Sequence, residues 1–227
     1  MISDKYKCVF IHIPKTAGQS IEHFFLDVHD LTWKERSPLL LRYNADPNMG
    51  PERLAHLTAE EYVEHGYMAH DLFASYFSFS FVRNPWARLL SEYKYKHYHT
   101  EYTFKEFVTI FFPKKDRYSD EYRHVMPQYE FLHDSNGELV VDFVGRFEKL
   151  QSDFDFVCSK LGISSSLLPY VNSSVKKEGV INKIHKLFSK KPLSPQHYTS
   201  YYDDELRDIV GEKYHLDIST FGYEFGQ

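Results

Sequence analysis

The sequence predicts an α/β fold, with a single domain over residues 1–227 and a mostly parallel sheet flanked by helices. Short runs of β-branched and aromatic residues alternate with amphipathic segments of helical spacing, which is typical of a parallel sheet covered on both faces. A chain of 227 residues is long for one domain and short for two. Hydrophobic residues make up 42% and charged residues 26%, as in ordinary globular proteins and unlike disordered ones.

The first expected elements are a strand, a tight loop and a helix. The strand covers residues 7–13, where β-branched and aromatic side chains dominate, and Pro14 ends it. A short loop with Gly18 then leads into an amphipathic helix. A second helix is expected over residues 58–65, because a threonine at its start is followed three residues later by a glutamate in a capping-box pattern.

A second strand is expected over residues 76–82. Asn84 and Pro85 follow it as the N-cap and first-turn proline of the next helix. This helix is expected to bury Trp86, Leu89, Leu90, Tyr93 and His97. Strand, loop and helix thus recur in the same order as at the start of the chain, which predicts two parallel strands.

The rest of the chain continues this alternation. A third strand is expected over residues 139–147, followed by a helix that Gly162 ends. Asp203 is the expected N-cap of the last helix. Residues 164–200 are rich in Ser, Lys and Pro, and we expect a long connection within the one domain there.

Composition excludes several classes of protein. The net charge of −5 is unlike the basic footprint of a nucleic-acid binder, so any anion site must be local. We expect no membrane span and a cytoplasmic protein, because no apolar run reaches 18 residues and no signal-peptide pattern opens the chain. Cys8 and Cys158 are too few for a disulfide framework or metal site, and we expect buried thiols.

Aromatic residues are unusually frequent, at 17% of the chain. The 19 Phe, 18 Tyr and 2 Trp fit either an aromatic core with tyrosines reaching the surface or a surface on which sugar rings stack. Both interpretations remain open, and they are compatible with each other.

The loop after the first strand has the features of an anion site. A strand that ends in a loop and a helix start directs free backbone N–H groups and the positive helix end at one point. Lys15 adds a cation, while Thr16 and Ser20 add hydroxyl donors. The lysine precedes Gly18, so the phosphate-loop motif of nucleotide triphosphatases is missing, and a kinase is the alternative rather than the leading interpretation.

A second anion site is expected where the second strand ends. Arg83 stands at its carboxyl end, the edge of an α/β sheet where ligands bind, and its guanidinium suits a phosphate. Ser91 lies eight residues later, about two helical turns on, on a helix face shared with Asn84 and Ala87.

These two segments together resemble the signature segments of the sulfotransferase superfamily: FIHIPKTAGQS at residues 10–20 and FVRNPWARLLSEY at residues 81–93. VDFVGRFE at residues 141–148 and FGYEF at residues 221–225 are similar to segments of the carbohydrate (type 2) sulfotransferases. The resemblance implies a P-loop-like nucleotide-binding core and transfer of a sulfuryl group from 3′-phosphoadenosine 5′-phosphosulfate to a hydroxyl, expected to belong to a carbohydrate. A non-catalytic carbohydrate-binding module is a further alternative, suggested by the tyrosines.

The resemblance also assigns residues. It implies that the 5′-phosphosulfate is held by Lys15, Thr16, Ala17, Gly18, Gln19 and Ser20. Arg83 and Ser91 would hold the 3′-phosphate. Lys15 would stabilise the charge that develops on the leaving oxygen. Because a sulfuryl group carries less charge than a phosphoryl group, no metal is expected.

The acceptor hydroxyl needs a general base, and the chain has 13 histidines. His56 precedes a helix between the two anion segments, in a position that resembles the catalytic histidine of relatives, and His70 is the alternative. His12 lies within the first strand and is expected to be a core or edge residue. The possible contacts to the acceptor are Tyr122, Arg123, Gln128, Tyr129, Lys176 and Lys177.

Overall fold

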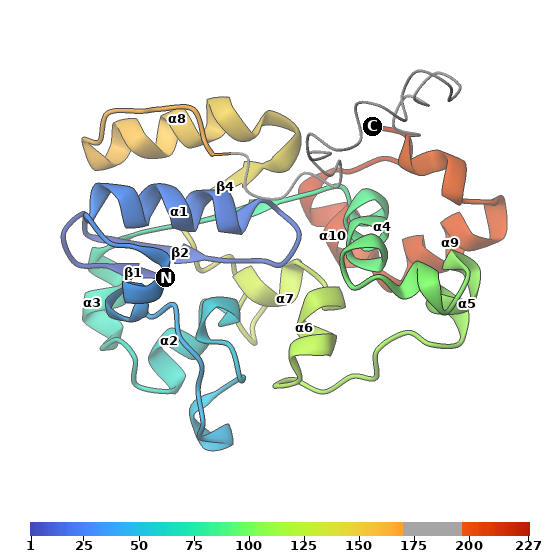
Figure 1. Cartoon of the computed structure of the whole chain (residues 1–227), viewed down its shortest axis with the longest axis horizontal. Coiled ribbons are helices and arrows are strands. Elements are labelled where there is room, and N and C mark those ends of the chain that lie inside the picture. Colours follow the sequence, from blue (N-terminus) through green and yellow to red (C-terminus); the bar gives the residue numbers. More distant parts are fainter. Residues whose placement is uncertain (170–196) are drawn as a thin grey trace, which may run out of the picture.

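A four-stranded sheet lies at the centre of the computed structural model, which describes residues 1–169 and 197–227 (Figure 1). Its strands are β1 (Ile2–Ser3), β2 (Cys8–Ile11), β3 (Phe77–Val82) and β4 (Phe143–Arg146), in that spatial order. β2, β3 and β4 are parallel, and β1 pairs with β2 in the antiparallel sense. The mostly parallel sheet flanked by helices is therefore confirmed.

Side chains on alternate positions of a strand point to opposite faces of a sheet, and both faces are apolar here. One face packs against α1 (Gly18–Val28) and α8 (Leu150–Leu161), which lie on the same side of the sheet in Figure 1. The cluster there is built around Phe10, Phe24, Phe25, Phe79, Phe81 and Phe154. These phenylalanines support the interpretation of the aromatic excess as core residues.

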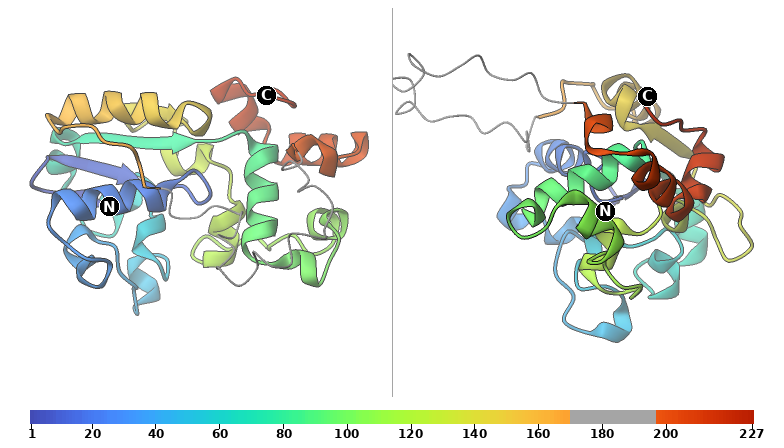
Figure 2. Two further views of the ribbon diagram at one scale, coloured as in Figure 1. Left: turned by 45° about the horizontal axis from the view of Figure 1, so that its top comes forward. Right: turned by 90° about the vertical axis from the view of Figure 1, so that its right-hand side faces the viewer.

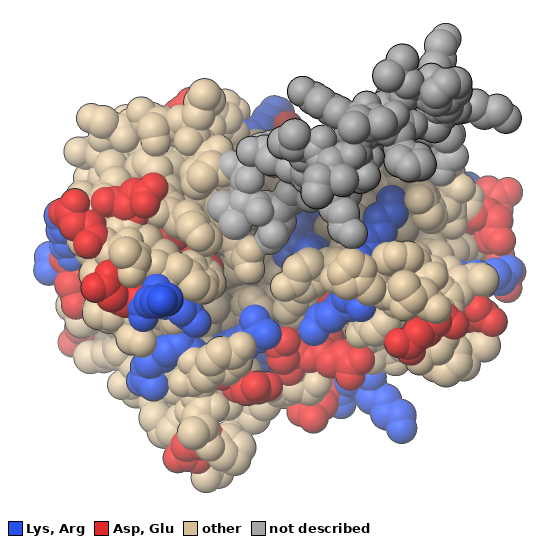
Figure 3. Space-filling view, in the orientation of Figure 1, with Lys and Arg blue, Asp and Glu red and all other residues tan. Residues whose placement is uncertain are grey.

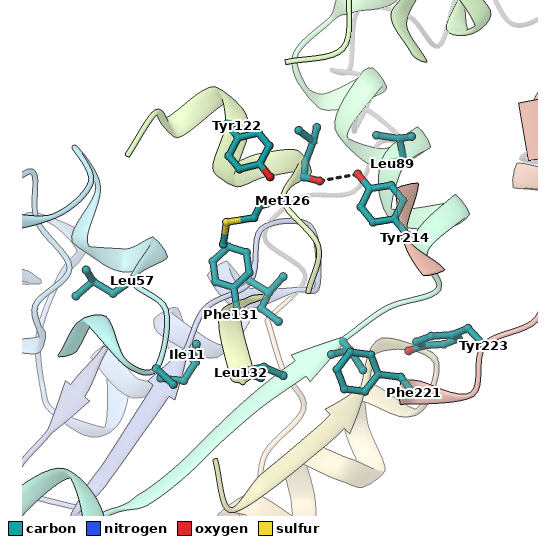
Figure 4. Close-up of a cluster of buried hydrophobic side chains, with 14 of the residues drawn as sticks. Ile11, Leu57, Leu89, Tyr122, Met126, Phe131, Leu132, Tyr214, Phe221 and Tyr223 are labelled. Carbon is teal, nitrogen blue, oxygen red and sulfur yellow. Dashed lines mark hydrogen bonds between the residues drawn. The ribbon is translucent and has the colours of Figure 1, made fainter. Parts of the chain in front are cut away.

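The opposite face packs against α2 (Glu61–Glu64), α3 (His70–Ser75) and α7 (Tyr129–Leu132). Figure 4 shows part of this second core, in which Ile11 of β2 lies near Leu132 of α7 and Tyr214 donates a hydrogen bond of 2.6 Å to the Val125 carbonyl oxygen. The core continues beyond the sheet, because the same cluster includes side chains from the helices described next.

Several helices lie beyond the carboxyl ends of β2 and β3, as Figure 1 and the left view of Figure 2 show. They are α4 (Pro85–Tyr95), α5 (Phe104–Thr109), α6 (Asp120–Val125), α9 (Asp204–Lys213) and α10 (His215–Phe221). Asn84 and Asp203 cap α4 and α9, where their side chains accept from the Ala87 and Leu206 N–H groups at 3.3 and 2.7 Å. Both caps were expected from the sequence.

Short 3₁₀ helices fill the connections. They cover Trp33–Glu35, Ser37–Leu39, Pro47–Met49, Leu54–His56, Tyr98–Thr100, Phe147–Lys149 and Tyr198–Tyr201. The last of these overlaps the end of the long connection expected over residues 164–200, of which residues 170–196 lie outside the described residues. No helix within residues 1–169 and 197–227 is long and apolar enough to cross a membrane.

Two expectations about helices are wrong in detail. The helix expected over residues 58–65 is reduced to α2, which lies between Ala59, whose N–H group donates to the Phe131 carbonyl oxygen at 2.8 Å, and Gly66, which has a φ of 71°. The Glu61 carboxylate accepts from the Thr58 N–H group at 2.9 Å, as one half of a capping box does. His97 does not join the buried side of α4, since the helix ends at Tyr95 and His97 is exposed with φ of 58°. Cys8 and Cys158 are buried free thiols, as expected.

Candidate active site

The loop between β2 and α1 has an unusual backbone. Lys15 and Ala17 both lie in the left-handed region, with φ of 71° and 74°. For residues other than glycine this conformation costs about 1–2 kcal/mol each and persists only where surrounding contacts hold it. The loop leads into the first turn of α1, where the Ser20 N–H group donates to the Ala17 carbonyl oxygen at 2.9 Å and the positive end of the helix lies at the carboxyl end of β2. Such a backbone can bind an anion.

Two arginines hold this loop from the side of α4. Arg88 is 1% exposed and donates from Nε to the Pro14 carbonyl oxygen at 2.9 Å, while its Nη groups donate to two carbonyl oxygens at the end of α6. Arg83 donates from Nη1 to the Lys15 carbonyl oxygen at 3.2 Å. The two segments that sequence analysis singled out are therefore in direct contact.

Gly18 allows an imidazole to lie against the loop. A Cβ atom at this position would lie 2.0 Å from Cδ2 of His12, a separation that no side chain tolerates. Nδ1 of His12 is 2.5 Å from a carboxylate oxygen of Glu22 on α1, and both side chains are buried. His12 was expected to be a core or edge residue; it is buried, but it belongs to this site.

Lys15 is half-buried beside the loop, with Nζ 3.6 Å from the ring centroid of Tyr95. Burial lowers the pKa of Lys15 to about 8, although the charge of Glu92 acts in the opposite direction. An ammonium with a lowered pKa gives up its proton more readily than an ordinary lysine. It is therefore suited to donating a hydrogen bond to an oxygen that gains charge.

Arg83 is fixed through its backbone. Its N–H group donates to Oε1 of Gln128, and Nε2 of Gln128 donates to its carbonyl oxygen, both at 2.8 Å. Gln128 is held in turn by Asp217, whose carboxylate accepts from its backbone N–H group at 3.0 Å. The guanidinium carbon of Arg83 lies 4.1 Å from the ring centroid of Phe147. Gln128, a possible acceptor contact in the sequence, is buried and orients Arg83.

The other residues expected to hold the donor are either buried within the loop or half-buried on a helix. The Thr16 hydroxyl is buried and donates to the Ile13 carbonyl oxygen at 2.8 Å, so it stabilises the loop rather than facing outward. Gln19 and Ser20 are half-buried in the first turn of α1, and Ser91 is half-buried on α4.

His56 lies at the centre of a buried group of titratable side chains. Nδ1 of His56 is 3.2 Å from Oδ1 of Asp120, and its ring centroid is 5.1 Å from those of both His12 and His124. Burial lowers the pKa of His56 to about 3, although the hydrogen bond that the imidazole donates to Asp120 acts in the opposite direction, so the imidazole is neutral at physiological pH. Burial acts to raise the pKa of Asp120, but the hydrogen bond from His56 and nearby cations hold it well below its usual value.

His12 and His56 line an open pocket. Three arginines and two exposed aromatic side chains line its outer part: Arg36, Arg42, Arg53, Trp33 and Tyr43. Trp33 stacks on His23 at 4.8 Å between ring centroids, and Arg36 covers Trp33 at 4.6 Å. Figure 3 shows Lys and Arg side chains gathered near the middle of this face of the molecule, with acidic side chains beside them.

Comparison with known proteins agrees with this geometry. The model of a family described as "Sulfotransferase family" matches residues 1–224. The chain belongs to the sulfotransferase family. It is also 32% identical to an uncharacterized protein of Archaeoglobus fulgidus over 113 residues, which is 45% of this chain and 82% of that protein. No solved structure matches the chain.

The two histidines proposed as the base of this sulfotransferase lie apart. His70 begins α3, before β3 starts, so the length of β3 separates it from Arg83. Its side chain is 83% exposed, with Asp71 at 3.5 Å. His56, in contrast, lies next to His12 and opens on the pocket.

The described residues that were expected to contact the acceptor are buried or half-buried in the sulfotransferase. Arg123 is fully buried in an ion pair with Glu61 and donates to the His56 carbonyl oxygen at 2.6 Å, so it supports His56 from behind. Tyr122 is buried and Tyr129 is half-buried. Lys176 and Lys177 lie outside the described residues.

Sequence reasoning missed four side chains of the site: Glu22, Arg88, Asp120 and His124. Glu22 could have been found from its place one turn into the helix after the anion loop, four residues past Gly18. The others gave no local signal, because α4 and α6 bring them to the loop only in the folded chain.

Proposed function

We propose that this sulfotransferase transfers a sulfuryl group from 3′-phosphoadenosine 5′-phosphosulfate to a hydroxyl of a carbohydrate. The observation that carries the proposal is the contact between Arg83 and the Lys15 carbonyl, which joins the strained loop at the helix start to a second cation. A donor with one anionic group at each of two positions suits this pair better than ATP does. The proposal includes a single domain over residues 1–227 with a P-loop-like nucleotide-binding core.

The residues present fit such a donor. The backbone N–H groups at residues 16–19, the Ser20 hydroxyl and the Lys15 ammonium would hold the 5′-phosphosulfate, with Gly18 allowing close approach. Arg83 and Ser91 would hold the 3′-phosphate. The donor supplies the sulfuryl group together with a leaving phosphate oxygen. The chain supplies positioned donors where that oxygen gains charge, and no metal is needed for this role.

Lys15 is the proposed electrophilic residue. Its half-buried ammonium donates a hydrogen bond to the leaving oxygen, where negative charge grows as the bond to sulfur breaks. Because that charge is larger in the transition state than in the bound donor, the interaction raises the rate more than the affinity.

His56 is the proposed general base. Its imidazole is neutral, and Asp120 fixes the orientation of the ring through Nδ1. It accepts the proton of the attacking hydroxyl as the new oxygen–sulfur bond forms. His12 is the alternative, because it lines the same pocket and Glu22 holds its ring in the same way. Substitution of each separates the two assignments.

The pocket favours a carbohydrate acceptor that carries negative charge. Trp33 and Tyr43 are partly exposed at its rim, where aromatic faces can stack on sugar rings. Arg36, Arg42 and Arg53 line the same wall, and a guanidinium pairs with a carboxylate or sulfate in two parallel hydrogen bonds. A non-catalytic sugar-binding module would use this wall but not Lys15 or Arg83. A kinase would require magnesium and ATP.

The experiment is transfer of labelled sulfate from the donor to acidic oligosaccharides, without added metal. We expect Lys15→Ala to lower turnover by roughly 10²-fold or more with little change in donor affinity. Arg83→Ala is expected to weaken donor affinity instead. Lys94→Ala is the matched control, since Lys94 rests on the ring of Tyr201 at 4.2 Å, away from the loop. Full transfer activity in Lys15→Ala would contradict the mechanism.

A further inference from the structure

Three potential metal ligands meet beside the pocket. His56, Asp120 and His124 each present one nitrogen or carboxylate oxygen, and these atoms all lie within 4.8 Å of one another. Asp120 Oδ1 is 3.2 Å from Nδ1 of His56 and 3.8 Å from Nε2 of His124. Ligand atoms on one tetrahedral Zn²⁺ lie roughly 3.3 Å apart at bond lengths of about 2.0 Å. Small movements of the three side chains would bring their ligand atoms to this separation.

The second observation is the state of His124. Its Nδ1 is 2.9 Å from a carboxylate oxygen of Glu92, and both side chains are more than nine-tenths buried. Its Nε2 is buried without a hydrogen-bond partner and is directed at Asp120. A carboxylate at one imidazole nitrogen with a bare second nitrogen is the arrangement that orients histidine ligands of metals. Burying a polar atom without a hydrogen-bond partner destabilises the folded protein, and a bound cation would remove this cost.

We propose that His56, Asp120 and His124 form a binding site for a divalent transition metal ion, of which Zn²⁺ is the best match. Two imidazoles and one carboxylate are ligands of the type that Zn²⁺ takes, and a fourth position remains for water. Hard ions such as Mg²⁺ prefer oxygen ligands and are excluded by the two nitrogens. Cys8 and Cys158 do not compete, because both thiols are buried elsewhere.

Two cationic side chains lie beside the Asp120 carboxylate. Nε of Arg53 and Nζ of Lys96 lie 3.4 and 3.7 Å from oxygens of Asp120. Their side chains are 43% and 29% exposed, so both can turn toward solvent when the metal ion arrives. Removing either cation should strengthen metal binding, which is a direct consequence of the proposal.

The site has a consequence for catalysis that rests on the proposed function. A metal ion on His56 occupies a ring nitrogen and fixes the side chain, so the residue no longer accepts the acceptor proton. Zn²⁺ is therefore expected to inhibit the proposed transfer reaction, which itself needs no metal. The metal site and the role of His56 as base can fail independently.

The test uses Co²⁺ as a spectroscopic probe on the untagged full chain. We expect one Co²⁺ per chain with visible absorption of a site of low coordination number, displaced by Zn²⁺. His124→Ala should weaken Co²⁺ binding at least 100-fold, and Glu92→Gln by roughly 10-fold or more. Lys96→Ala should strengthen it. Circular dichroism reports whether each variant is folded, and anomalous diffraction at the zinc edge locates the ion in the wild type regardless of the variants.

The matched control is the double substitution of His97 and His99 to alanine. These exposed histidines lie with ring centroids 5.6 Å apart and are the obvious surface competitor. Loss of the cobalt bands in this variant, their persistence in His124→Ala, or their absence from the wild type would overturn the proposal. Zn²⁺ binding at the three residues without inhibition of transfer would leave the metal site standing and refute His56 as the base.

Discussion

At Lys15, burial sets both the chemistry and its pH range. The ammonium is half-buried and rests on the ring of Tyr95, and its pKa is lowered to about 8. In the proposed mechanism, only the protonated form donates a hydrogen bond to the leaving oxygen. The lowered pKa therefore makes the residue a better donor and at the same time confines its action to the neutral and acidic range.

This predicts the pH profile of kcat/KM for the donor, which reports ionisations of the free enzyme. We expect kcat/KM to fall above about pH 8 as Lys15 loses its proton. Between about pH 5 and pH 7 the profile should be flat, because the pKa of His56 is lowered to about 3 and the base is already neutral. A value that stays constant to about pH 10 would contradict the role of Lys15, and a rise between about pH 5 and pH 7 that of His56.

The histidine assignment leads to a second prediction at this scale. His56→Ala should lower turnover by roughly 10²-fold or more, the usual range for a positioned base, without changing donor affinity. His70→Ala is the control and should have little effect, since its side chain is 83% exposed. Single-turnover rates measure both variants. Should His12→Ala abolish turnover while His56→Ala stays active, the base is the imidazole that Glu22 holds.

Individual site residues differ in how far the sequence could predict them. Lys15 and Arg83 were predictable because parallel strands end at the same edge of a sheet, which brings their following residues together. His12 was not predictable, because the sequence pattern around a histidine in a strand is the same whether the side chain packs in a core or faces a ligand. Asp120 and His124 are more than 60 residues from His56 in the sequence and reach it on α6, so no local pattern marks them.

Among the elements, the turn from β2 into α1 carries the site. Arg83 and Arg88 donate hydrogen bonds to the Lys15 and Pro14 carbonyl oxygens of this turn, and the start of α1 passes against the ring of His12. The strain of the loop is therefore balanced by contacts from the next strand–helix unit. The sheet and these two arginines together shape the proposed donor site.

The third prediction tests this close approach. Gly18→Ala places a methyl group about 2 Å from the His12 ring, so either the imidazole or the helix start must move. We expect the free energy of unfolding to drop by about 2 kcal/mol, within the range for overpacking a buried site, with loss of transfer activity. Gly211→Ala is the matched control. Its new methyl group would meet Trp86 at an ordinary 3.5 Å, and helix propensity predicts a gain of up to about 1 kcal/mol. Equal stability of the two variants in urea unfolding would show that the approach at Gly18 is not needed.

Element positions were largely predictable, whereas their ends were not. The strand expected over residues 76–82 is β3, shorter by one residue, because its apolar alternation is clear in the sequence. The strand expected over residues 139–147 shrinks to β4, since Leu139 is half exposed and pairs only with His133. α2 is short because it lies between Ala59, whose N–H group donates to the Phe131 carbonyl oxygen, and Gly66, which has a φ of 71°. Tertiary contacts and local backbone geometry account for these differences.

In the molecule as a whole, the residues that form the apolar core are separate from those that form the candidate site. The sheet, with α1 and α8 on one face and α2, α3 and α7 on the other, is apolar on both sides and bears the loops at one edge. The helices beyond that edge supply Arg88, Asp120 and His124, which complete the site (Figure 2). This arrangement allows the loops to vary in chemistry without disturbing the core.

The central claim is that the paired anion sites bind a nucleotide with separate 3′- and 5′-phosphate groups, and a thermal-shift comparison tests it most directly. A ligand that binds only the folded chain stabilises it by mass action. We predict that adenosine 3′,5′-bisphosphate raises the melting temperature without magnesium, that ATP does so only weakly, and that Arg83→Ala reduces the shift. A melting temperature unchanged by the bisphosphate at millimolar concentration, with magnesium and ATP stabilising the protein instead, would contradict the account and favour a kinase.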